Sequence, residues 1–143
     1  MKGVYRQAVM AAACAVAAAG PAWASEQAAV DATAVEAATQ WLGIVDAGDY
    51  GRSYDEASSV VRVALSKDRW TASLTGIRTP LGRLIARART TATATTQLPG
   101  APDGRYVVVT FSASLENKQA ANETVTVAKD ADGAWRVAGY FIN

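Results

Sequence analysis

Four arginines that lie close together in the sequence could bind an anion: Arg78, Arg83, Arg87 and Arg89. The last three alternate along the chain, so a strand that is regular from Arg83 would place them on one face. Side chains two positions apart on a strand lie about 7 Å apart, which suits bidentate binding of a carboxylate or another extended anion. The alternative is an edge strand that its charges keep soluble. We take Arg78 and Arg87 as candidate ligand-binding residues.

A second candidate site is a pocket of aromatic side chains with a carboxylate beside them. The aromatic residues that could line it are Trp41, Tyr50, Tyr54, Trp70, Phe111 and Trp135. A buried Glu123 or Asp46 next to a tyrosine hydroxyl could act as a general base with an oxyanion donor. The alternative is an ordinary aromatic core in which Glu123 pairs with Lys118 or with an arginine across the sheet. Tyr50, Tyr54, Trp70 and Glu123 therefore join the candidate ligand-binding residues.

Composition argues against most familiar catalytic chemistries. The chain has no histidine, and histidine is both the commonest general base near neutral pH and the commonest metal ligand. Its one cysteine is Cys14, in an N-terminal segment that we expect to be removed. We assign no catalytic residue, and we expect no metal site and no cofactor.

The N-terminal segment has the three parts of a secretory signal peptide in the right order. Lys2 and Arg6 give a positive start, an apolar stretch follows over residues 9–19, and Ala22-Trp23-Ala24 places small residues before a cut at Ser25. The sequence therefore predicts a signal peptide over residues 1–24 and a periplasmic or secreted protein.

Two alternatives remain for this segment. A retained membrane anchor needs about 20 unbroken apolar residues, whereas Gly20 and Pro21 interrupt this stretch. A lipoprotein would carry its lipid on Cys14, although apolar sequence continues past that residue. Cleavage would leave residues 25–143, a length that suits one domain with its own core.

The charge of the mature chain is close to neutral. Removing Lys2 and Arg6 from the 14 basic residues leaves 12, against 13 acidic residues. Proteins that bind polyanions are usually more basic than this. We therefore expect no nucleic-acid partner.

The first half of the mature chain has helical periodicity. An amphipathic helix that stops near Gly48 is predicted from the spacing of Val30, Ala34, Ala37, Trp41 and Ile44. Asp49 can cap a short second helix with two tyrosines one turn apart. Ser66 can cap a third, which Thr79-Pro80 would end. Three helices are expected before the first strand.

From Leu84 the period changes from about 3.6 to about 2, as in a half-buried strand. Four alanines would share one face of this strand: Ala86, Ala88, Ala92 and Ala94. Turn-forming residues over 98–104 predict a hairpin. The expected strands are Leu84 to Thr95, Arg105 to Leu115, about Ala121 to Lys129, and Trp135 to Ile142. Helices packed on one face of an antiparallel meander make an α+β fold.

Many spaced positions resemble the bacterial family known as domain of unknown function 4019. In the helical half the matching residues include Trp41-Leu42, Val45-Asp46, Gly48, Tyr50, Ser53, Ser66, Trp70, Arg78, Pro80-Leu81-Gly82 and Arg87. In the second half they include Leu98-Pro99-Gly100, Pro102-Asp103-Gly104, Glu123-Thr124-Val125-Thr126, Trp135-Arg136-Val137 and Gly139-Tyr140-Phe141-Ile142. The resemblance covers nearly the whole mature chain and agrees with export. It implies no catalytic residue.

The order of elements also resembles the cone-shaped fold of ketosteroid isomerases and nuclear transport factors, in which a curved sheet wraps around helices and leaves a pocket. Our leading hypothesis is a non-enzymatic exported domain that binds a small ligand or another envelope protein on the concave side of its sheet. The alternative is a small enzyme of the cone fold that uses a carboxylate for proton transfer.

Overall fold

A computed structural model describes residues 22–143, with side chains described from residue 32 onward. Most of the predicted signal peptide, including Lys2, Arg6 and Cys14, lies outside the described residues. None of the described helices is long and apolar enough to cross a membrane.

The helical half contains four helices and a short 3₁₀ turn. They are α1 (Ala22–Asp46), α2 (Tyr50–Asp55), α3 (Ser59–Ala64), α4 (Lys67–Arg78) and η1 (Thr79–Leu81). The two predicted caps are confirmed, because the side chains of Asp49 and Ser66 accept from Arg52 N and Arg69 N. The prediction of three helices is wrong, because α3 was missed. The residues of α3 include three valines, which favour strands. The helix begins directly after its N-cap residue, Ser58, whose side chain accepts a hydrogen bond from Val60 N.

The second half is a four-stranded antiparallel meander, which confirms the α+β class. Its strands are β1 (Leu84–Thr95), β2 (Tyr106–Leu115), β3 (Lys118–Lys129) and β4 (Trp135–Ile142), paired in the order β1-β2-β3-β4. The bounds of β1 and β4 are those predicted, whereas β3 begins three residues before Ala121.

Two bulges in β1 change which residues face α1. Register shifts follow Leu84 and Arg89, so Ile85 and Thr90 are extra residues in the ladder. Ala86 and Ala88 lie opposite Ser114 and Ser112, on the face away from α1, but Ala92 lies opposite the buried Val109. The prediction that the four alanines share one face is therefore wrong, because each bulge exchanges the two faces.

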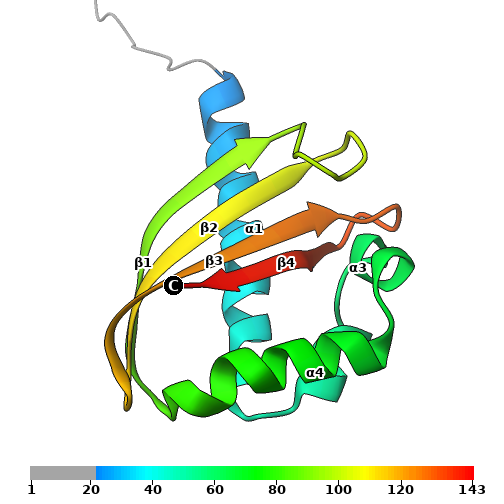
Figure 1. Cartoon of the computed structure of the whole chain (residues 1–143). Coiled ribbons are helices and arrows are strands. Elements are labelled where there is room, and N and C mark those ends of the chain that lie inside the picture. The colour runs from blue at the N-terminus through cyan, green and yellow to red at the C-terminus, as the bar shows by residue number, and fades with distance from the viewer. Residues whose placement is uncertain (1–21) are drawn as a thin grey trace, which may run out of the picture.

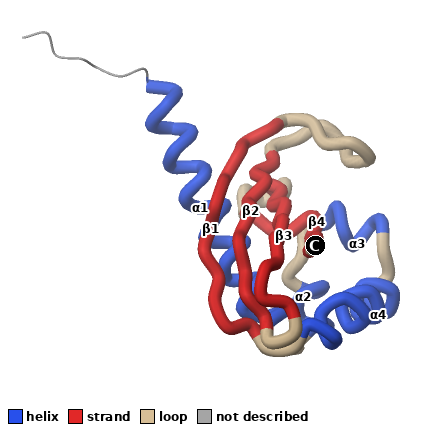
Figure 2. The backbone as a smooth tube through the Cα atoms, turned by 60° about the vertical axis from the view of Figure 1, so that its left-hand side comes forward, coloured by secondary structure: helices blue, strands red, loops and turns tan. Residues whose placement is uncertain are grey.

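The core lies between α1 and the sheet. Figure 1 shows α1 passing behind all four strands, and Figure 2 shows α3 and α4 beside β4, away from β1. The buried α1 residues are Ala34, Ala38, Trp41, Leu42 and Val45, and the sheet residues in the same cluster are Val107, Val109, Phe111, Val125, Val127 and Val137. Each large apolar side chain buried in this way contributes about 1.5–3 kcal/mol.

Candidate functional site

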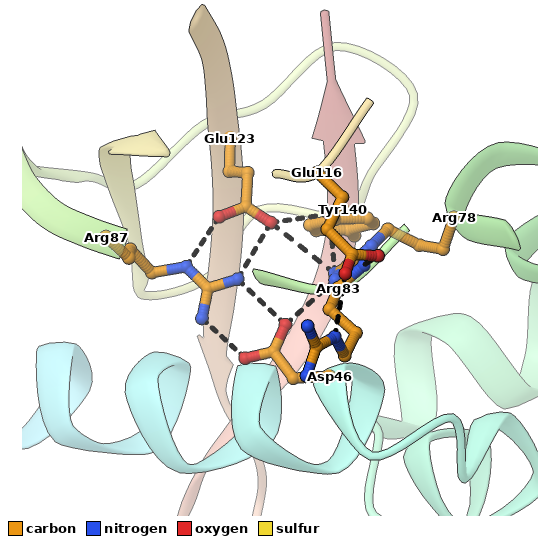
Figure 3. A network of polar contacts seen from close by, with 7 residues as sticks. All are labelled: Asp46, Arg78, Arg83, Arg87, Glu116, Glu123 and Tyr140. Carbon is orange, nitrogen blue, oxygen red and sulfur yellow. Dashed lines mark hydrogen bonds and ion pairs between the residues drawn. The ribbon is translucent and has the colours of Figure 1, made fainter. Parts of the chain in front are cut away.

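Five polar side chains from five different elements meet at the lower end of this core (Figure 3). We call them the arginine–carboxylate cluster. They are Asp46 at the end of α1, Arg78 at the end of α4, Arg87 in β1, Glu123 in β3 and Tyr140 in β4. The cluster therefore ties both long helices to three strands.

Glu123 has no solvent exposure and is surrounded by donors. Arg87 Nε donates to Oε2 at 2.6 Å, and Arg87 Nη2 donates to Oε1 at 3.0 Å. Tyr140 OH also donates to Oε1, at 2.7 Å. Arg78 Nη1 lies 3.6 Å from the same oxygen. Both carboxylate oxygens are therefore occupied by charge-assisted hydrogen bonds.

Asp46 binds the same two arginines from the opposite side. Arg87 donates from Nη1 to Oδ2 at 2.7 Å and from Nη2 to Oδ1 at 3.0 Å, and Arg78 Nη2 donates to Oδ1 at 2.9 Å. The side chains of Arg78 and Arg87 are only 4% and 12% exposed. Two buried cations thus face two carboxylates, and their charges balance.

The surroundings shift the pKa values of four members of the cluster, Asp46, Arg78, Arg87 and Tyr140. Burial alone would raise the pKa of Asp46, but hydrogen bonds from Arg87 and Arg78 hold it below its ordinary value of 3.8. Burial, and then the negative charge of Glu123, raises the pKa of Tyr140. For Arg87, burial would lower the pKa, but Asp46 and Glu123 raise it. At neutral pH the cluster therefore holds charged arginines, an ionised Asp46 and a protonated tyrosine.

This chemistry favours positioning over proton transfer. A general base needs a carboxylate free to accept a proton from a substrate, whereas every oxygen of Glu123 and Asp46 already accepts from an arginine or a tyrosine. Among the buried side-chain nitrogen and oxygen atoms of the described residues, Arg78 Nε is the one without a hydrogen bond.

The six sequence-predicted ligand residues fall into two groups. Arg78, Arg87 and Glu123 come together in the arginine–carboxylate cluster. Tyr50, Tyr54 and Trp70 lie instead in or against the hydrophobic core, with the buried Trp70 ring centroid 6.4 Å from that of Tyr54. Ligand binding by any of the six stays a prediction.

The aromatic residues that were expected to line a pocket pack against one another. Trp41 contacts both Trp70 and Tyr140, with ring centroids 6.1 and 5.5 Å apart. The buried Ser53 receives both indole N–H groups, one on its carbonyl oxygen at 2.9 Å and one on its Oγ at 3.0 Å. These contacts make the region an ordered aromatic core.

The prediction that Arg83 shares a face with Arg87 and Arg89 is wrong. Arg83 precedes β1, and the bulge after Leu84 breaks the alternation on which the prediction depended. Arg83 pairs with Glu116 at the surface, with its side chain 87% exposed. Since Arg87 and Arg78 are already bound by carboxylates, the expected row of free guanidinium groups does not form.

Tyr140 is the member of the cluster that sequence reasoning missed. Simple alternation would place Val137 and Tyr140 on opposite faces of β4. A register shift leaves Ala138 as an extra residue, so Val137 lies opposite Val127 and Tyr140 opposite Val125, all facing α1. The only sequence signal is the glycine beside it, since an isolated glycine in a strand suggests a bulge.

Two hollows lie away from the cluster's polar centre. The first, which we call the β4 cleft, has a volume of about 400 Å³ and lies between α3, the β1–β2 loop and β4. Its walls include Val60, Ala64, Leu65, Trp70, Leu98, Tyr106, Thr126, Gly139 and Tyr140. None of the described residues that line it carries a charge.

The second hollow, which we call the sheet recess, also has a volume of about 400 Å³. It opens where the strands bend, and its walls include Ala86, Ala88, Ser112, Ser114, Gln119, Ala120 and Asn122. In the part of the chain that the structure describes, no three His, Cys, Asp or Glu side chains gather where they could hold a metal ion.

Comparison with known proteins gives one match. Residues 37–140 match the family described as protein of unknown function DUF4019. The match covers β1 to β3, most of β4, α2 to α4 and the C-terminal part of α1, and the chain belongs to this family. No curated protein matches, and no solved structure matches.

The geometry of the cluster predicts a ranking of stabilities. Glu123→Gln should lower the free energy of unfolding by roughly 3 kcal/mol, because Arg87 and Arg78 lose their buried countercharge. Tyr140→Phe should cost about 1–2 kcal/mol, since one hydrogen bond to a charged group is lost. Glu116→Gln, the control at the exposed pair with Arg83, should cost much less than either of these, because water already solvates both charges. Urea unfolding followed by tryptophan fluorescence measures all three, and equal losses for Glu123→Gln and Glu116→Gln would contradict the ranking.

Asp46 predicts a pH dependence of stability. Since its pKa is lower in the folded state, its stabilisation is full above the unfolded value near 3.8 and is lost as pH falls through the folded value. The difference in unfolding free energy between wild type and Asp46→Asn should therefore be largest at pH 5–7, roughly 1–3 kcal/mol, and should shrink below pH 3. A difference that stays constant from pH 7 to pH 2.5 would contradict this account.

Proposed function

We propose that the protein is a non-enzymatic binding domain whose ligand is small and mainly apolar and places an uncharged part in the β4 cleft. The observation that carries this proposal is the composition of the walls. Trp70, Tyr106, Tyr140 and Leu65 present apolar surface, and none of the described lining residues is charged. Binding sites for small molecules are typically concave, apolar and about 300–1,000 Å³ in volume.

Fixed walls support this proposal, because a preorganised site loses little entropy on binding. Trp70 is held by its hydrogen bond to Ser53, and Tyr106 by its hydrogen bond to the Pro102 carbonyl. Tyr140 is held by Glu123. On this view the arginine–carboxylate cluster serves the site indirectly, since it fixes one aromatic wall of the cleft.

The saturation of Glu123 and Asp46 supports a non-enzymatic role. Proton transfer by either carboxylate would require breaking buried hydrogen bonds, from Arg87 and Tyr140 in the case of Glu123 and from Arg87 and Arg78 in the case of Asp46, at a cost of several kcal/mol. The enzyme alternative keeps only one favourable feature, a buried carboxylate next to a tyrosine hydroxyl. An envelope protein in place of a small ligand remains the second candidate for the same surface, because Leu65 and Val63 are exposed beside the cleft.

We also propose the cone-shaped architecture and export. The curved sheet with helices gathered toward one end supports the cone arrangement (Figure 2). The order of charged, apolar and small residues over residues 1–24 supports a signal peptide. Cleavage before Ser25 would remove the first three residues of α1 and leave every residue of the β4 cleft in place.

An uncharged fluorescent probe, N-phenyl-1-naphthylamine, tests the cleft. It should bind wild type with increased emission and raise the melting temperature. Gly139→Val should weaken binding by about tenfold or more, because a side chain at residue 139 enters the cleft while its Cβ makes only an ordinary 3.9 Å contact with Thr126.

Ala120→Val in the sheet recess is the matched control, and it should bind the probe as wild type does. Loss of binding in Ala120→Val but not in Gly139→Val would move the site to the sheet recess. Absence of binding to wild type would overturn the proposal.

Export is tested by the N-terminus of the protein made in a bacterial host. Mass spectrometry of the envelope fraction should find a chain that begins at Ser25, and Ala24→Lys should leave the precursor uncleaved because the cut requires a small residue there. A chain retaining Met1 in the cytoplasm, or one that carries lipid on Cys14, would contradict this expectation.

A further inference from the structure

The β4 cleft adjoins another hollow, separate from the sheet recess, on the outer side of α3. This outer recess has a volume of about 340 Å³ and is lined by Ser59, Val60, Val63, Ala64, Gly100 and Pro102. Three of these residues, Val60, Ala64 and Gly100, also line the β4 cleft. The two hollows therefore meet along the line where α3 faces the β1–β2 loop, and together they form an elongated apolar path.

Small apolar residues form the junction, which is the boundary that the two hollows share. Gly100 stands on the loop side, and a Cβ built on it would meet no atom within 4 Å. Val60 and Ala64 stand on the helix side.

The frame around the junction is fixed at both ends of α3. Ser58 N donates to the Val137 carbonyl at 2.8 Å, and Ser58 Oγ donates to Asp130 at 2.6 Å. Beyond the other end of the helix, Tyr54 OH donates to the Leu65 carbonyl at 2.7 Å. Because α3 is anchored on both sides, the junction does not depend on induced fit.

The chemistry of the path is uniform along its length. The described residues of the outer recess, like those of the cleft, carry no charge. Val63, at the outer recess, is 89% exposed, which leaves its apolar surface free to contact a ligand. A charged or polar group of a ligand would be solvated only where the path reaches solvent, beyond the outer recess.

We propose that the ligand is an unbranched hydrocarbon chain, the acyl chain of a fatty acid or of a lipid, which threads between α3 and the β1–β2 loop. Its methyl end lies in the β4 cleft against Trp70 and Tyr140, and its polar end emerges beside Val63 and Pro102. This inference rests on the proposed function, because it assigns the ligand class to the same cleft.

A series of saturated fatty acids tests the chain. Octanoic, decanoic, dodecanoic and tetradecanoic acids, each below its critical micelle concentration, compete with N-phenyl-1-naphthylamine for wild type. Affinity should rise by up to about fourfold for each methylene that is buried, and the rise should stop when the chain extends beyond the outer recess.

Val63→Trp should block the outer recess, because residue 63 lines that hollow and not the β4 cleft. The variant should still bind the probe in the β4 cleft but should lose the gain with chain length. Ala72→Trp, at an exposed position of α4 outside both hollows, is the matched control and should keep that gain.

The results separate failure of this inference from failure of the proposed function. Probe binding without any gain from chain length, or a gain that survives Val63→Trp, would overturn the acyl-chain inference but would leave the proposed apolar binding site in the β4 cleft unaffected. Absence of probe binding would overturn both. Incubation with phosphatidylcholine vesicles, reisolation and mass spectrometry then distinguish the source: retained phospholipid indicates a lipid ligand, whereas retention of added free acid alone indicates a fatty acid.

Discussion

The position of Arg87 between Asp46 and Glu123 is the interaction on which the lower end of the structure depends. All three guanidinium nitrogens are bound, with Nη2 shared between the two carboxylates at 3.0 Å on each side. Burying either carboxylate alone would cost several kcal/mol, so neither could remain ionised here without the arginines. The bridge therefore fixes where α1 ends relative to β1 and β3, and this placement gives the sheet its helix-covered face.

Tyr140 carries that constraint into the aromatic core. Its hydroxyl is held by Glu123, while its ring contacts Trp41, which in turn contacts Trp70. Ser53 fixes the two tryptophans through their indole N–H groups, so polar contacts position the rings at both ends. Because Trp70 and Tyr140 also line the β4 cleft, the shape of that cleft follows from the cluster and from Ser53.

The sequence predicted what depends on local periodicity and failed where the period is interrupted. The caps at Asp49 and Ser66 and the bounds of β1 and β4 were right, because they depend on residues near each other in the chain. Bulges inside β1 and β4 were not predicted, and each bulge reverses the faces of the residues that follow. This explains both the misplaced alanines and the omission of Tyr140. The pairing of Glu123 with an arginine was foreseen as an alternative. The pairing of Asp46, 77 positions away from Glu123, with the same arginines was not foreseen.

The two carboxylates that stabilise the arginine–carboxylate cluster also make it a poor site for binding an anion. An incoming carboxylate would have to displace Asp46 or Glu123, and the displaced group would be left buried without a partner. In contrast, the β4 cleft exposes aromatic and aliphatic surface whose polar neighbours are already satisfied, such as the hydroxyl of Tyr106 bound to the Pro102 carbonyl. An apolar ligand can therefore enter without breaking any hydrogen bond that the fold requires. The division of the molecule into a saturated polar cluster and an adjacent uncharged cleft supports the proposal that recognition takes place in the cleft.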